Sequence, residues 1–143
     1  MVELPQFKEN NMQVTPIDHK GFISALSQDA PSIILFRSKT DEHTKKSKSI
    51  HKIISNITNM PPVYFYELVV NENEENQLLC DTIEIPNGLS MVLFKNGCFS
   101  RYKQNPTTEA AIKSLWKAAS TRNQKQFKSQ EKQTSSEYTP LDI

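Results

Sequence analysis

The chain has 143 residues, a length typical of one domain, and its 17 basic and 16 acidic residues leave a formal net charge of +1. This balance excludes a strongly basic nucleic-acid arm or an acidic solvating chain as the main character of the protein. With only three glycines, the sequence contains no glycine-rich phosphate loop of the GxGxxG or GxxxxGK type.

The compartment is predicted from what the sequence lacks. Its apolar runs fall far short of the ~20 residues of a membrane helix, and residues 1–11 contain no apolar signal segment. The two cysteines, Cys80 and Cys98, do not form a CxxC motif and are too few for a disulfide scaffold. We therefore expect an intracellular, cytoplasmic protein with free thiols and no membrane span.

The first predicted elements are a short strand over residues 12–16 and a helix over residues 19–28. Asp18 directly precedes this helix and can cap its free N–H groups. The apolar spacing predicts that one face of the helix is buried, formed by Phe22, Ile23 and Leu26.

A continuous apolar run over residues 32–37 then predicts a strand that is buried on both faces. A long helix follows to about residue 59, with Thr40 or Asp41 as its cap. Its buried seam is expected to consist of four isoleucines, Ile50, Ile53, Ile54 and Ile57.

The second half of the chain continues the alternation of strands and helices. We expect a strand over 63–70, a short helix over 71–81, a hairpin of strands 90–94 and 98–103 around an Asn-Gly turn, and a helix from Thr107 or Thr108 to Ala119. The order β-α-β-α-β-α-β-β-α predicts an α/β fold with a mixed central sheet flanked by helices on both faces.

The domain is predicted to span residues 12–119. Residues 1–11 are expected to be loosely ordered. Residues 120–143 are rich in Gln, Ser, Lys and Thr, and this composition cannot bury enough apolar surface to offset chain entropy. We therefore predict a disordered C-terminal tail.

Three stretches resemble the thioredoxin-like superfamily. The segment Met91-Val92-Leu93-Phe94-Lys95-Asn96-Gly97 is similar to the family's strand-and-turn of three apolar residues followed by FKxG. Residues 32–36 precede a polar stretch and a long helix, and residues 63–70 precede an acidic short helix, as in that family. The resemblance covers about residues 12–119 and implies the thioredoxin-like fold.

The resemblance also shows which family residues are missing. Counted from Phe36, the redox motif falls on Asp41-Glu42-His43-Thr44, so both active-site cysteines are absent. The family's buried strand carboxylate falls on Leu35. The cis-proline position falls on Leu89 without gaps, or on Pro86 with a short insertion, and both assignments stay open. The resemblance thus implies a redox-inactive member without dithiol chemistry.

The favoured function is therefore a protein-binding module, such as an adaptor, assembly factor or complex subunit, and not an enzyme. Its partner would be another protein, either acidic or presenting an extended peptide, while the oligomeric state stays open. The fold implies a binding groove formed by two segments, with residues Lys39, Thr40, Asp41, Glu42, His43 and Thr44 on one side and Asn87, Gly88, Leu89 and Ser90 on the other.

An alternative is a single-thiol oxidoreductase or redox sensor that uses Cys98. This residue follows the Asn-Gly turn on an exterior strand, and Arg101 three residues on can favour a thiolate. Cys80 lies beside Asp81, which disfavours a thiolate there. No residues are spaced as a metal site around His19 or His51, and we expect neither metal nor cofactor.

A further alternative is an RNA- or anion-binding subunit that uses the basic helix 45–52. Its cationic residues form a basic patch of Lys45, Lys46, Lys48 and Lys52. No aromatic residue lies between them, so the sequence does not predict a base-stacking platform.

Overall fold

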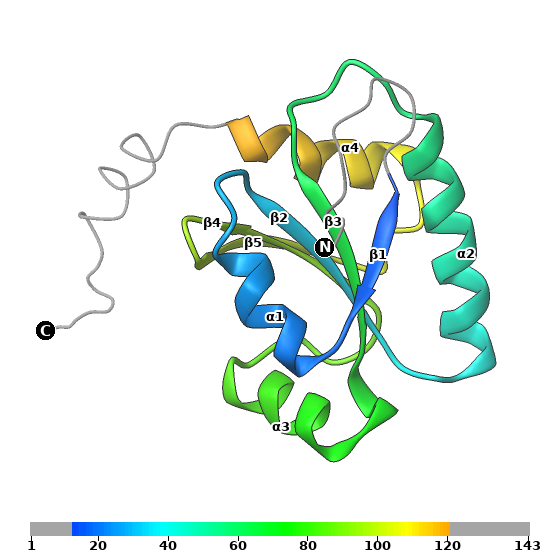
Figure 1. The fold of residues 1–143 in the computed structure, drawn as a ribbon. Helices are drawn as coiled ribbons and strands as arrows, with labels where there is room; N and C mark the ends of the chain where they lie inside the picture. The colour runs from blue at the N-terminus through cyan, green and yellow to red at the C-terminus, as the bar shows by residue number, and fades with distance from the viewer. Residues whose placement is uncertain (1–12, 121–143) are drawn as a thin grey trace, which may run out of the picture.

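The computed structural model describes residues 13–120 of the chain (Figure 1). The predictions for residues 1–11 and 121–143 lie outside these residues. Ser120 itself lies in a short 3-10 helix, η2 (Ala118–Ser120), which extends the last α-helix. Between residues 13 and 120, none of the helices has the length and apolarity needed to cross a membrane.

A five-stranded mixed sheet forms the centre of the fold. Its strands are β1 (Val14–Ile17), β2 (Ser32–Arg37), β3 (Tyr64–Val69), β4 (Ser90–Lys95) and β5 (Cys98–Gln104). They lie in the order β1-β3-β2-β4-β5, in which β3 is parallel to β1 and β2, β4 is antiparallel to β2, and β5 is antiparallel to β4. The predicted α/β fold with a mixed central sheet is confirmed.

Helices cover both faces of this sheet. The α-helices are α1 (His19–Leu26), α2 (Asp41–Asn56), α3 (Glu74–Thr82) and α4 (Glu109–Lys117), and the 3-10 turn η1 (Val70–Glu72) precedes α3. Helices α2 and α4 lie over one face of the sheet, and α1 and α3 lie over the other (Figure 1). The basic helix α2 and the acidic short helix α3 therefore lie on opposite faces of the sheet.

Side-chain caps set where the helices begin. The Asp18 carboxylate accepts a hydrogen bond from Gly21 N at 2.9 Å, and the Thr40 hydroxyl accepts one from His43 N at 3.2 Å. The Thr108 hydroxyl accepts a hydrogen bond from Ala111 N at 3.1 Å. Each bond satisfies one of the free N–H groups of a helix start. Of the open alternatives, Thr40 and Thr108 are thus the caps of α2 and α4.

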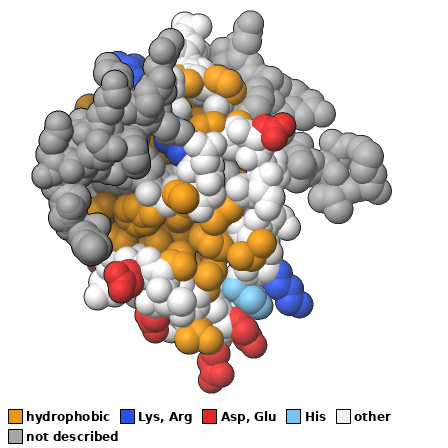
Figure 2. All heavy atoms as spheres, turned by 90° about the vertical axis from the view of Figure 1, so that its left-hand side faces the viewer, with side chains coloured by type: hydrophobic (Ala, Val, Ile, Leu, Met, Phe, Trp, Pro, Cys, Tyr) orange, Lys and Arg blue, Asp and Glu red, His pale blue; other side chains and the backbone are white. Residues whose placement is uncertain are grey.

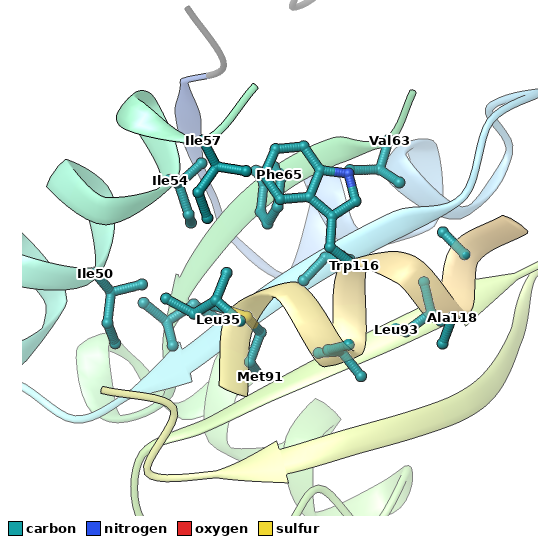
Figure 3. Packing of buried hydrophobic residues seen from close by; sticks show 14 of the residues in the cluster. Leu35, Ile50, Ile54, Ile57, Val63, Phe65, Met91, Leu93, Trp116 and Ala118 are labelled. Atoms are coloured by element: carbon teal, nitrogen blue, oxygen red, sulfur yellow. The ribbon is translucent and has the colours of Figure 1, made fainter. Parts of the chain in front are cut away.

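Two apolar clusters hold the layers together. Between the sheet and α2 and α4, Trp116 packs edge-on against Phe65 with ring centroids 4.7 Å apart, and its Nε1 donates to Pro61 O at 2.7 Å (Figure 3). Ile50 and Ile54 are buried in the same cluster as predicted, while Ile53 is partly buried.

The prediction that Ile23 belongs to the buried face of α1 is wrong. This side chain is 64% exposed, whereas Phe22 and Ala25 are buried. Ile23 follows Phe22 by one residue and is therefore turned by about 100° around the helix, away from the sheet. Helix α1 has only eight residues, about two turns, and its buried residues are Phe22 and Ala25, which lie one turn apart.

Candidate functional site

A cavity of about 190 Å³ lies where β2 and β3 end and the segments that follow them meet the loop before β4. The start of α2 and the whole of α3 lie at this same end of the sheet (Figure 1). We call this cavity the groove; its lining consists of Arg37, Ser38, His43, Val70, Asn71, Gln77, Cys80, Asp81, Ile85, Pro86, Asn87 and Gly88.

The segment between β2 and α2 is held by hydrogen bonds around His43. The Ser38 backbone N–H donates to His43 Nδ1 at 3.0 Å, and the Ser38 hydroxyl lies 2.9 Å from the same nitrogen. Because a backbone N–H can only donate, Nδ1 accepts, and the neutral ring carries its proton on Nε2. The Ser38 hydroxyl also lies 3.0 Å from the Thr40 hydroxyl, which caps α2. This wall of the groove is therefore built before any ligand arrives.

A second bond joins this wall to η1. The Lys39 backbone N–H donates to Asn71 Oδ1 at 2.9 Å, and the Lys39 ammonium lies 3.7 Å from Glu72 Oε1. The ion pair is solvent-exposed and contributes little stability. The backbone-to-amide bond is what keeps the two loops together across the groove.

Beneath the start of α2 lies a buried carboxylate, Glu67 of β3, which is 9% exposed. Its Oε2 accepts from Arg37 Nε at 2.8 Å and from the Ser47 hydroxyl, and its Oε1 lies 3.5 Å from His51 Nε2. Burial alone would raise the pKa of Glu67, but the hydrogen bonds from His51, Ser47 and Arg37 outweigh burial and lower this pKa to about 2. Glu67 is therefore charged at neutral pH and fixes three side chains.

The Glu67 carboxylate fixes Arg37 at the groove wall. The Arg37 guanidinium also donates from Nη1 to Ser38 O at 2.9 Å and to the Thr44 hydroxyl at 3.3 Å. These three hydrogen bonds leave this side chain little rotational freedom. Arg37 thus connects the sheet, the β2–α2 segment and the first turns of α2.

Sequence reasoning did not single out Glu67 as a buried, paired residue. In the register of β2 and β3, Glu67 lies opposite Leu35, the residue at the family's carboxylate position. The signal was present in the sequence, because Glu67 is the one charged residue within the apolar run 63–70. A charge inside a strand of that composition indicates a buried, paired group.

The two thiols lie in different surroundings. Cys80 lines the groove but is only 4% exposed, and burial followed by the charge of Asp81 raises its pKa to about 11. Its thiol is therefore protonated at neutral pH. Cys98 is exposed at the start of β5 and does not line the groove.

The structure brings together part of the predicted groove. His43, Asn87 and Gly88 line the cavity. The other predicted residues are placed around it: Lys39, Thr40, Asp41 and Glu42 are exposed at the start of α2, Thr44 is half-buried, and Leu89 and Ser90 are buried at the start of β4. The groove also includes residues of η1 and α3 that the sequence did not point to.

The loop before β4 contains both candidates for the cis-proline position. Leu89 directly precedes β4 and is buried, whereas Pro86 lines the groove. Every peptide bond in residues 13–120 is trans.

Gly88, in the same loop, has a φ of +87°, and the amide Nε2 of Gln104 lies 3.1 Å from where a Cβ on Gly88 would stand. A side chain at this position would therefore be strained and crowded.

The predicted basic patch lies along the outer side of α2. Lys46 Nζ pairs with Glu42 at 3.0 Å, while within residues 13–120 no ion pair involves Lys45, Lys48 or Lys52. In the same range, no three His, Cys, Asp or Glu side chains lie close enough to hold a metal ion.

Comparison with solved structures identifies the fold. The chain is similar to a thioredoxin from Malassezia sympodialis, with a TM-score of 0.61 and 18% identity over 81% of this chain and 98% of that one. It is also similar to spinach chloroplast thioredoxin f (short form), with a TM-score of 0.61, 15% identity, and 80% and 100% of the two chains covered. Mitochondrial thioredoxin 3 of Saccharomyces cerevisiae gives a TM-score of 0.56 at 18% identity, over 73% and 93%.

These similarities show a thioredoxin-like fold. No protein-family model and no curated protein matches the sequence. The fold is therefore shared with thioredoxins.

Proposed function

We propose that this chain is a redox-inactive, thioredoxin-like protein-binding module, an adaptor, assembly factor or complex subunit that holds an extended segment of another protein in the groove. The observation that carries the proposal is a preformed groove without a usable thiol. Asp41, Glu42, His43 and Thr44 stand at the start of α2. The cysteine in the lining, Cys80, is buried and has a raised pKa.

The size of the groove supports a peptide ligand. Pockets for cofactors and drug-sized molecules usually have volumes of roughly 300–1,000 Å³. At about 190 Å³, the groove holds one large side chain of a peptide that continues across its rim. Its lining combines apolar groups (Val70, Ile85 and Pro86) with amide and imidazole groups that can orient a bound main chain.

The rigidity of the walls supports binding without chemistry. Glu67, Arg37 and Thr44 tie the sheet to α2, and the bond from Lys39 N to Asn71 ties the two loops together. Preformed walls lower the entropy lost when a ligand binds. The module thus retains the recognition surface of its fold without a dithiol that could be oxidised or reduced.

Two measurements test this function. We expect no turnover of insulin disulfides by the full chain in the presence of dithiothreitol. Peptides selected on the wild-type protein should bind saturably in fluorescence anisotropy, and Asn87→Trp, which fills the groove, should abolish that binding. Lys52→Trp is the matched control, because Lys52 is exposed on α2. Insulin turnover that disappears on mutating a cysteine, or binding that survives Asn87→Trp, would overturn the proposal.

The second candidate is thiol chemistry at Cys98. Its exposure favours this function, because a reactive thiol must be accessible. Alkylation by iodoacetamide as a function of pH distinguishes the candidates, since an ordinary thiol shows a midpoint at about 8.5. A midpoint well below that value would favour the single-thiol function.

A further inference from the structure

Strand β5 forms an open edge of the sheet. Within residues 13–120 it pairs with β4 alone, so the backbone groups on its outer side have no partner strand. Such an edge is a template for pairing with another extended chain. What can pair there depends on the side chains that β5 presents to its two faces.

Those two faces differ in chemistry. Phe99 pairs with Phe94, and Tyr102 pairs with Val92, so both aromatic rings lie on the face covered by α1 and α3. Arg101 pairs with Leu93, and Lys103 pairs with Met91, so both cations lie on the face covered by α2 and α4. An irregularity in the β4–β5 register inserts one extra residue after Phe99. This bulge lets two aromatic residues three positions apart share a face.

The aromatic side of β5 is an exposed apolar surface joined to the core. Phe99 is 45% and Tyr102 is 48% exposed, and their ring centroids lie 6.1 Å apart. Phe99 in turn lies 6.0 Å from the buried Phe94. Figure 2 views the side of the molecule where α1 and the β4–β5 hairpin lie, and it shows hydrophobic side chains gathered into a patch. Exposed patches of this kind mark interaction sites.

The other side of β5 carries uncompensated positive charge. Within residues 13–120, neither Arg101 nor Lys103 forms an ion pair. A cavity of about 440 Å³ lies between β5 and α4, and its lining includes Arg101, Lys103 and Ser114 but no acidic residue. Burial, and to a lesser extent the charge of Arg101, lowers the pKa of nearby Lys95.

We propose that β5 is a docking edge for an extended segment of a partner protein in which acidic residues alternate with apolar ones. The segment adds a strand to the sheet through main-chain hydrogen bonds. Successive side chains of a strand point to opposite faces. Its acidic side chains therefore reach Arg101 and Lys103, while its apolar side chains pack on Phe99 and Tyr102. This site is separate from the groove and does not depend on the function proposed for it.

The arrangement favours a peptide over a single-stranded nucleic acid. A nucleic acid strand stacks its bases on aromatic rings within a positively charged groove that follows its phosphates. By their pairing with β4, the two aromatic residues and the two cations of β5 belong to opposite faces of the sheet, while all four contribute to the lining of the cavity beside α4. A β-strand, by contrast, supplies different side chains to the two faces at every second residue.

The test uses the full chain and two synthetic peptides of identical composition. In the first, Glu alternates with Val and Phe; in the second, the Glu residues are grouped at one end. We expect the alternating peptide to bind saturably in fluorescence anisotropy, to protect β5 amides from hydrogen exchange, and to bind more weakly as salt increases. We expect the grouped peptide to bind at least about tenfold more weakly, because only the alternating pattern satisfies both faces.

Variants separate the two faces of β5. The double change Arg101→Glu and Lys103→Glu should weaken the binding of the alternating peptide by about tenfold. The matched control, Lys45→Glu with Lys52→Glu, changes the net charge equally on α2 and should leave binding unchanged. Tyr102→Ser tests the aromatic side and should also weaken binding. Lys103 is half-buried and the other substituted residues are exposed, and circular dichroism verifies that the variants fold.

Four results would overturn the proposal. The first is equal binding of the two peptides, and the second is an equal effect of the β5 and α2 charge reversals. The third is β5 amides that are already protected in the free chain, which would show that its own terminal residues or a second copy occupy the edge. The fourth is a single-stranded oligouridylate that binds through Phe99 and Tyr102 more tightly than the alternating peptide.

Discussion

Acidification should reveal the Glu67 carboxylate as a source of stability. Its pKa in the folded protein is about 2, against the usual 4.5. In the window between these values the unfolded chain takes up a proton that the folded protein does not, so stability falls as the pH falls. The difference corresponds to roughly 3 kcal/mol, present in full above pH ~4.5 and lost as the pH approaches ~2.

The variant Glu67→Gln isolates this contribution from those of other carboxylates. It keeps the shape of the side chain but removes its charge, and it leaves the Arg37 guanidinium, whose side chain is only 18% exposed, without its ionic partner. We expect the variant to be less stable by about 3 kcal/mol at neutral pH, the scale found when one member of a buried pair is removed. As the pH falls toward ~2 most of the difference should disappear, because the wild-type carboxylate then becomes protonated in the folded protein as well.

Urea unfolding of the full chain, followed by circular dichroism at a series of pH values, measures this difference. The control is Glu72→Gln, because the Glu72 side chain is 53% exposed and only 3.7 Å from an exposed lysine. Its effect should stay within about 1 kcal/mol at every pH. Parallel stability curves for the wild type and Glu67→Gln would refute the reasoning, since they would show that Glu67 has the same pKa in the folded and unfolded chains.

Four further predictions concern the core, the thiol, the chain end and the basic patch. Ile54→Ala should cost about 2–5 kcal/mol in urea unfolding, because Ile54 is buried and the change leaves a cavity. Cys80 should resist alkylation at neutral pH in the folded protein and react on unfolding, since its pKa is raised to about 11; fast native alkylation would contradict this. Removal of residues 121–143 should shift the thermal midpoint little, and a loss above roughly 2 kcal/mol would show that they pack on the domain. Reversing Lys48 and Lys52 to Glu should leave folding intact. If α2 faces an acidic partner, the same change should slow association with that partner and reduce the salt dependence of the association rate. Association rates that stay unchanged at every salt concentration would show that this face of α2 contacts only solvent.

The sequence predicted the elements of the fold where local chemistry determines them. The apolar run of β2, the isoleucine seam of α2 and the Asn-Gly turn each point to one local structure. In that turn Asn96 and Gly97 both have positive φ, as the dipeptide indicates. Element ends were predicted less well: α2 ends at Asn56, where Ile57 turns to extended backbone, and not near residue 59.

The groove was predicted only in part, because two of its walls depend on long-range contacts. Asn71 enters the lining through its hydrogen bond with Lys39 N, and Cys80 enters it through the packing of α3 on the sheet. Nothing local in the sequence places these residues beside His43. The same holds for Phe99, which shares a face with Tyr102 only because of the bulge in β5.

The pairing of Leu35 with Glu67 places a buried charge on β3, directly opposite an apolar residue of β2. Leu35 is buried in the apolar cluster under α2, so that position needs no ionic partner. The carboxylate is supplied by β3, directly opposite in the register, where Arg37, Ser47 and His51 can all reach it. A carboxylate with three donors and a pKa of about 2 is not suited to exchange protons near neutral pH. Its effect is to fix Arg37 and the start of α2, which is what a rigid binding groove requires.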